Sequence, residues 1–184
     1  MALVLIKETG SGVTGANSYA DAVDGDAYHD GHCYAAAWTA ATTGQKEAAL
    51  VMATRLIDAY CEFLGSKSLA GQPLQWPRWA CPDRDATQIA NPLSPFGSRL
   101  GCFDSGTIPA PLVNATCEQA RCLLVEDLTL APTGAGLKSS AVSNLKTVYD
   151  KTSAPPVLSR VARRFLGKLG CVLGDGGSAR LIRA

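Results

Sequence analysis

Side chains suited to metal or acid–base chemistry are most concentrated at positions 29–33. The sequence there, His-Asp-Gly-His-Cys, offers two imidazoles, a carboxylate and a thiol. A zinc site needs three or four such ligands that converge in a tetrahedron, and the rest of the sequence has no second cluster of matching spacing. We therefore expect no metal site.

Nucleophilic catalysis and nucleotide binding lack the motifs that would frame them. Seven cysteines and two histidines could supply a nucleophile and a base, but no nucleophile elbow or other catalytic signature surrounds them. The glycine-rich segment 10–15 has neither the spacing of a dinucleotide-binding turn nor the Lys-Ser/Thr of a phosphate-binding loop. The sequence predicts no enzyme activity, no catalytic residue and no cofactor.

Segment 72–79, Gln-Pro-Leu-Gln-Trp-Pro-Arg-Trp, combines two tryptophans, two prolines and an arginine. Such a stiff apolar loop, with a cation near aromatic faces, could be a contact loop or a platform on which bases stack. In that interpretation Trp76, Arg78 and Trp79 are the contact residues. A second, structural interpretation is favoured: Trp76 fills the core, and Arg78 binds a carboxylate or a helix C-terminus. The sequence leaves both open.

The last periodic stretch, from 157 to 169, predicts an amphipathic helix with a basic face. That face could follow phosphates, dock on an acidic protein surface or lie in solvent. A glycine-rich tail, 174–184, comes after it and cannot fold alone, which favours docking. The candidate docking residues are Arg160, Arg163, Arg164 and Lys168 on the helix, and Arg180, Leu181, Ile182 and Arg183 in the tail.

Three earlier helices are predicted from apolar residues at helical spacing, over 18–30, 45–64 and 111–130. Ser18 is typical of an N-cap with Asp21 at the third position, and Gly65 of a C-cap. The buried face expected for the first helix is Tyr19, Ala22, Val23, Ala27 and Tyr28.

Strand signals are fewer. They predict a short strand over 3–7 and a hairpin around Ser143-Asn144, while the proline-rich segment 71–106 should be irregular. The predicted fold is mainly α, a small helical bundle with a minor β-hairpin or short strands and an extended C-terminal arm.

Composition and charge narrow the class of protein. The chain has 184 residues, 47% of them hydrophobic, and a mean hydropathy of +0.07, which suit one folded domain with an arm. Its opening apolar run is too short for a signal peptide or a membrane span, so we expect a soluble protein made in a cytosol, with no membrane partner. The seven cysteines show no C-x-x-C pair and should be reduced, packed thiols.

The charge is unevenly distributed along the chain. Residues 138–184 carry nine lysines and arginines against two aspartates, a net charge of +7. The first 137 residues carry eight basic and fourteen acidic side chains, a net charge of −6. The overall charge of +1 argues against a protein that coats nucleic acid by bulk charge alone.

Several ordered segments carry a family resemblance. They are ANSYADAVDGDAYHD at 16–30, Trp38, ATRLIDAY at 53–60, QPLQWPR at 72–78 and IPAPLVNATCEQA at 108–120. In this order and spacing, over 3–130, the chain resembles the head–tail connector, or adaptor, proteins of tailed bacteriophages. Members of this group are sometimes labelled DnaT-like single-stranded-DNA-binding proteins. The segment 81–106 between QPLQWPR and IPAPLVNATCEQA is an insert relative to that pattern.

The resemblance implies a structural protein of the virion neck, at the head–tail interface, made in the cytoplasm of a bacterial host. Residues 1–150 would form the helical connector domain, and 151–184 the basic C-terminal helix and docking tail. The protein would assemble into a ring of about twelve copies, bind the portal protein above and a tail or second adaptor (nozzle) protein below, and leave a channel for duplex DNA without reading its sequence. The alternative is a replication accessory protein that binds single-stranded DNA, with tryptophans as the stacking platform and the basic helix as the phosphate track.

Overall fold

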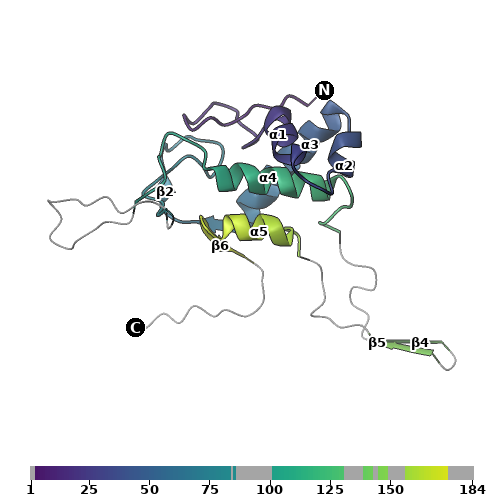
Figure 1. Cartoon of the computed structure of the whole chain (residues 1–184). Coiled ribbons are helices and arrows are strands. Elements are labelled where there is room, and N and C mark those ends of the chain that lie inside the picture. Colours follow the sequence, from purple (N-terminus) through teal and green to yellow (C-terminus); the bar gives the residue numbers. More distant parts are fainter. Residues whose placement is uncertain are drawn as a thin grey trace, which may run out of the picture.

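The computed structural model describes residues 3–83, 85, 101–130, 139–142, 145–148 and 156–173. These residues form a mainly helical fold with a minor antiparallel β component, as the sequence predicts (Figure 1). The helices are α1 (Ala22–Asp30), α2 (Ala36–Ala40), α3 (Thr43–Tyr60), α4 (Ala110–Leu123) and α5 (Arg160–Leu166). The strands are β1 (Cys61–Phe63), β2 (Ser66–Lys67), β3 (Arg78–Trp79), β4 (Ser139–Val142), β5 (Leu145–Val148) and β6 (Gly170–Val172).

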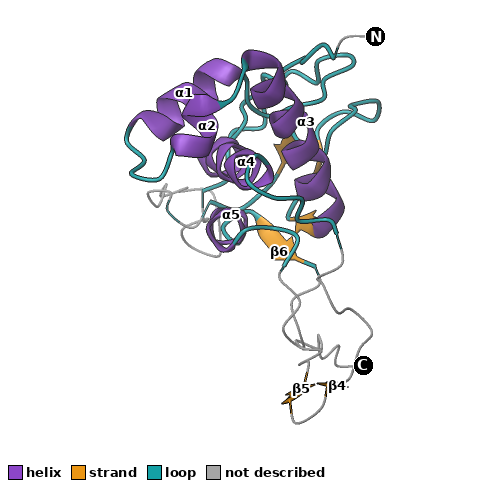
Figure 2. Cartoon of the chain, turned by 90° about the vertical axis from the view of Figure 1, so that its right-hand side faces the viewer, coloured by secondary structure: helices purple, strands orange, loops and turns teal. Residues whose placement is uncertain are grey.

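Helices α3 and α4 form the centre of the body, and α5 lies below α4 (Figure 2). The predicted apolar stripe of α3 is confirmed, because Ala49, Ala53 and Ile57 are buried. Small residues in the contact, including Cys117 and Ala120 of α4, let the two backbones approach closely. None of the helices in the described segments is long and apolar enough to cross a bilayer.

Helix α3 ends at Tyr60, four residues earlier than predicted, because Cys61 begins β1. The predicted role of Gly65 as C-cap is therefore wrong. Gly65 lies in the turn after β1 with φ +74°, and a Cβ there would lie 2.3 Å from the carbonyl oxygen of Trp79. The third predicted helix is also shorter, since α4 ends at Leu123.

The beginning of the chain differs from its prediction. The strand expected over 3–7 is reduced to a single parallel bridge between Lys7 and Ser18. The reason is the carboxylate of Glu8, which accepts hydrogen bonds from three backbone N–H groups of the following loop. These bonds hold the chain in a turn directly after Lys7, so the strand does not continue. Ser18 is held in that bridge, so Asp21 takes the place of N-cap, and α1 begins at Ala22.

The buried face of α1 differs in part from the predicted one, although Tyr19, just before the helix, is fully buried as predicted. Val23 and Ala27 are exposed, whereas Gly25 and His29 are buried. The cause is Trp38 of α2, whose ring packs on Gly25 so closely that a Cβ there would lie 2.2 Å from it. The spacing of apolar residues does not predict this face, because its buried residues are a glycine and a histidine.

Helix α5 belongs to the main hydrophobic core. Leu158, Ala162, Leu166 and Leu169 pack in the same cluster as Ile57 of α3. The buried side chain of Gln119 ties α5 to α4, since its amide donates to the carbonyl of Val157 (2.9 Å) and accepts from the N–H of Ser159 (2.8 Å). The helical part of 151–184 thus packs on the body, while the tail 174–184 lies outside the described residues.

Three two-stranded antiparallel sheets complete the described fold. Strand β1 pairs with β6, with Cys61 opposite Val172, and β2 pairs with β3. Strands β4 and β5 pair as the hairpin predicted around Ser143-Asn144, with Val142 opposite Leu145. The β1–β6 pair matters most for the site, because it fixes the chain after α5 to the end of α3.

Candidate nucleic-acid interface

An open cleft of about 790 Å³ lies between α5 and β6. We call it the arginine cleft, because three of the side chains along it are arginines. Its lining is Arg160, Val161, Arg163, Arg164, Gly167, Gly170, Cys171 and Val172. No acidic side chain is among these lining residues, while the exposed Glu62 lies opposite Cys171 in the β1–β6 pair.

Helical spacing explains why the arginines meet. Arg160 and Arg164 are one turn apart and lie on the same side of α5 as Arg163. The opposite side of α5 is buried, and the Ser159 hydroxyl caps its first turn by accepting from the N–H of Ala162 (3.1 Å). Arg160 and Arg164 are exposed, so their guanidinium groups are available to an anionic ligand.

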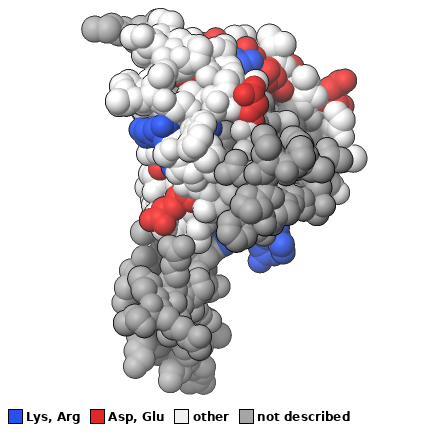
Figure 3. Space-filling model, turned by 90° about the vertical axis from the view of Figure 1, so that its left-hand side faces the viewer, with Lys and Arg blue, Asp and Glu red and all other residues white. Residues whose placement is uncertain are grey.

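The floor of the cleft is partly apolar. Val161, 46% exposed, and the half-buried Val172 border it. Acidic groups also lie on and just before α1, at the upper edge of the body in Figure 1, where Lys7 pairs with the N-cap Asp21 and with Asp24. Figure 3 shows acidic side chains near the top and at the lower left of the body, and basic side chains near the top, at the left and at the lower edge.

Lys168, predicted to act with the three arginines, does not line the cleft. Its ammonium forms an ion pair with Asp85 (Nζ to Oδ2, 2.5 Å), and that contact raises the pKa of Lys168. The other four predicted docking residues, Arg180, Leu181, Ile182 and Arg183, lie outside the described residues.

The contact loop predicted at Trp76, Arg78 and Trp79 is only partly available. Trp76 is fully buried between the rings of Phe63 and Phe103, so it is a core residue. Arg78 is buried too, and its guanidinium donates to the backbone carbonyls of residues 63, 64 and 65. The contact role is therefore wrong for these two residues, while Trp79 is 66% exposed.

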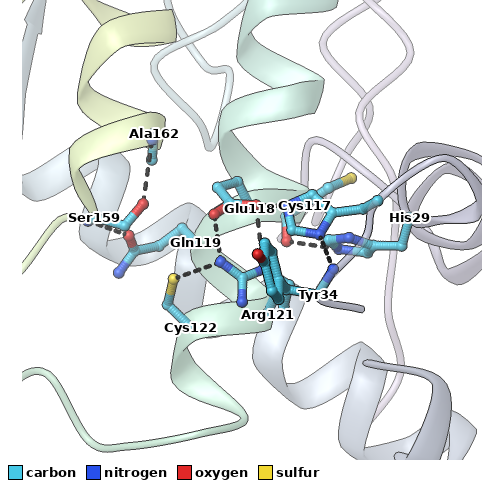
Figure 4. A network of polar contacts seen from close by, with 10 residues as sticks. His29, Tyr34, Cys117, Glu118, Gln119, Arg121, Cys122, Ser159 and Ala162 are labelled. Atoms are coloured by element: carbon cyan, nitrogen blue, oxygen red, sulfur yellow. Dashed lines mark hydrogen bonds and ion pairs between the residues drawn. The ribbon is translucent and has the colours of Figure 1, made fainter. Parts of the chain in front are cut away.

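The His-Asp-Gly-His-Cys cluster is divided between the core and the surface. His29 is buried against the ring of Trp38, its Nε2 lies 3.2 Å from the carbonyl oxygen of Cys117, and burial lowers its pKa (Figure 4). Cys33 is exposed. Within the described residues, no three His, Cys, Asp or Glu side chains are grouped to hold a metal ion. The seven cysteines are free thiols, and Cys33, Cys102 and Cys171 are exposed rather than packed.

Helix α4 also holds a buried ion pair that the sequence patterns did not predict. Glu118, 2% exposed, binds the guanidinium of Arg121 through both of its oxygens, at 2.6 and 3.3 Å (Figure 4). The ring of His32 lies on the same carboxylate, with Nε2 3.7 Å from it. The sequence does hold a signal for this ion pair: Glu118 and Arg121 are three residues apart in a predicted helix, and residues so spaced are neighbours on the helix surface.

The chain matches one family model along its whole length. That model, described as "Putative DnaT-like ssDNA binding protein", covers residues 1–184. The chain belongs to this family. The description of this family agrees with the alternative prediction, a protein that binds single-stranded DNA. It gives no support to the prediction of a head–tail connector. No curated protein and no solved structure matches this DnaT-like chain.

Proposed function

We propose that the protein binds single-stranded DNA along the arginine cleft. The observation that carries the proposal is the position of two exposed arginines, Arg160 and Arg164, one helical turn apart along one open cleft. Arginine binds phosphate oxygens in a planar, bidentate geometry, and each neutralised phosphate releases counterions. The description of the family supports the same ligand.

Two features favour an unpaired strand over a duplex. Helix α5 has seven residues and is about 10 Å long, so it serves a short run of phosphates. The apolar floor at Val161 and Val172 offers contact to base faces, which a duplex keeps stacked inside. The strand would lie with its phosphates on the arginines and its bases toward this floor.

The test is a titration of a fluorescently labelled oligodeoxythymidine of about 20 nucleotides, followed by anisotropy over a range of salt concentrations. The affinity should fall steeply with salt, and the double variant Arg160→Ala/Arg164→Ala should lower the slope of log K against log salt by about 1.4, since each phosphate contact contributes roughly 0.7. Arg55→Ala is the matched control, because Arg55 is an exposed arginine on α3. Equal weakening by the control, or binding that does not depend on salt, would overturn the proposal.

A ring-forming virion protein is the second candidate, and exposed apolar side chains favour it. Leu64, Leu69 and Trp79, between 43% and 66% exposed, lie in and around β2 and β3. Large exposed apolar groups often mark contacts with other proteins. Light scattering of the purified protein tests this candidate: a mass of about twelve chains, alone or with a portal protein, supports it, and a monomer that binds no portal excludes it.

A further inference from the structure

Four aromatic side chains form a continuous row from α1 to α5. Ring centroids are 6.3 Å apart between Tyr34 and His32, 6.4 Å between His32 and Tyr28, and 6.5 Å between Tyr28 and Phe165. We call these four residues the aromatic row. Tyr34 is its outer end and is 79% exposed, while the other three are half-buried.

The aromatic row and the arginine cleft share helix α5. Phe165 lies one helical turn after Val161, which lines the cleft, and directly follows Arg164, one of its three arginines. The side chain of Phe165 therefore lies next to the cleft on α5, although it does not line the cleft. Trp79 lies on β3 and is not among the residues that line the cleft.

The row is held in place from below. The N–H of Tyr34 donates to Nδ1 of His32 (3.1 Å), and the other ring nitrogen of His32 faces Glu118. The charge of Glu118 is compensated by Arg121, so the buried carboxylate does not repel a phosphate strand above it. Burial raises the pKa of Tyr28 to about 12, so this ring also stays neutral.

We infer that the aromatic row is the base-stacking part of the interface: unpaired bases stack on Tyr34 and its neighbours while the phosphates stay on the arginine cleft. This inference rests on the proposed function. Base faces stack on aromatic rings without regard to sequence, which suits a chain whose cleft offers cations and apolar contacts. The exposed end of the row is what a base would meet first.

The experiment compares two labelled oligomers of equal length, an oligodeoxythymidine and a fully abasic strand with the same phosphates. Tyr34→Ala should weaken binding of the oligodeoxythymidine about five-fold or more and leave the abasic strand unaffected. Tyr34→Phe keeps the ring and should bind as the wild type does. Trp79→Ala is the matched control, because it removes an exposed aromatic ring that belongs neither to the aromatic row nor to the lining of the cleft.

The outcomes separate this inference from the proposed function. If both oligomers bind the wild type equally, in a salt-dependent way that needs the arginines, the stacking role is overturned and the cleft stands. If neither oligomer binds at low salt, both proposals are overturned. Selective loss on Trp79→Ala instead of Tyr34→Ala would place the stacking elsewhere and overturn the inference.

A direct measurement of position supplements the binding data. An oligomer that carries 5-iododeoxyuridine should form a photo-crosslink to Tyr34 or His32, as mapped by mass spectrometry of the digested adduct. Crosslinks found only outside the aromatic row would overturn the inference. Since Tyr34 is 79% exposed, its variants should retain the circular dichroism spectrum of the wild type.

Discussion

Asp58 of α3 joins the segment before α1 to the loop before β3. One of its carboxylate oxygens accepts from the hydroxyl of Tyr19 (2.5 Å), and the other accepts from the N–H of Gln75 (3.1 Å). Burial raises the pKa of Asp58 to about 6 and that of Tyr19 well above its usual value. The charged form of the Asp58 carboxylate therefore destabilises the folded state relative to the protonated form.

The raised pKa predicts a pH dependence of stability. An aspartate in the unfolded chain titrates near 3.9, so between about 4 and 6 the folded state binds the extra proton. Lowering the pH from about 7 to about 4 should raise the free energy of unfolding through this group by up to roughly 3 kcal/mol. This contribution is fully present below about 3.9 and is lost as the pH rises through about 6.

Urea denaturation of the wild type and of Asp58→Asn at several pH values measures this effect. The variant cannot titrate at position 58, so the wild type should gain stability relative to it as the pH falls. Asp21 and Asp26, whose pKa values are lowered by hydrogen bonds and lysine contacts, titrate in both proteins and cancel in the difference. A difference in unfolding free energy that stays constant with pH would contradict the prediction.

At the scale of elements, the position of α5 decides whether the arginines form a cleft. The helix is too short to be stable alone, and its place is fixed by its buried apolar face and by the two hydrogen bonds of Gln119 to Val157 and Ser159. The β1–β6 pairing holds the chain that follows. The cleft is thus a product of two contacts, one on each side of α5.

Gln119→Ala should loosen this anchor. The loss of two buried hydrogen bonds should lower the free energy of unfolding by about 1–3 kcal/mol and weaken oligonucleotide binding, although Gln119 does not line the cleft. Asn114→Ala is the control, since it truncates a half-buried amide on the same helix. Denaturant unfolding and anisotropy measure the two effects, and unchanged binding by a destabilised variant would argue against the coupling.

At the scale of the whole molecule, the basic end and the acidic body share one core. The cluster that contains Ile57 and Leu112 also contains Leu158 and Leu166, from before and within α5. The segment 138–184, which has a net charge of +7, is therefore joined to the body through α5. Helix α5 shares the core of the body and is not a separate folding unit.

This arrangement predicts a single cooperative unfolding unit. Native-state hydrogen exchange should give the buried amides of α5 the same free energy of opening as those of α4, because neither helix can lose its packing without the other. Coincident denaturation curves from tryptophan fluorescence and circular dichroism should accompany this result. A clearly lower opening energy for α5 would show that the C-terminal helix unfolds independently.

The sequence by itself determined the features that depend on neighbouring residues. The stripe of α3, the hairpin of β4 and β5 and the spacing of the arginines on α5 all follow from local periodicity and turn residues. These patterns repeat every few residues along the chain, so they are readable without a partner segment.

The tertiary structure decided what depends on distant contacts. Helix α3 stops at Tyr60 because Cys61 pairs with Val172, and Trp76 is buried because Phe63 and Phe103 enclose it. The aromatic row likewise depends on the contact between Tyr28 of α1 and Phe165 of α5. The pattern of apolar and polar residues indicates which side chains can be buried. Only the packing of segments that are distant in the sequence decides which side chains are in fact buried.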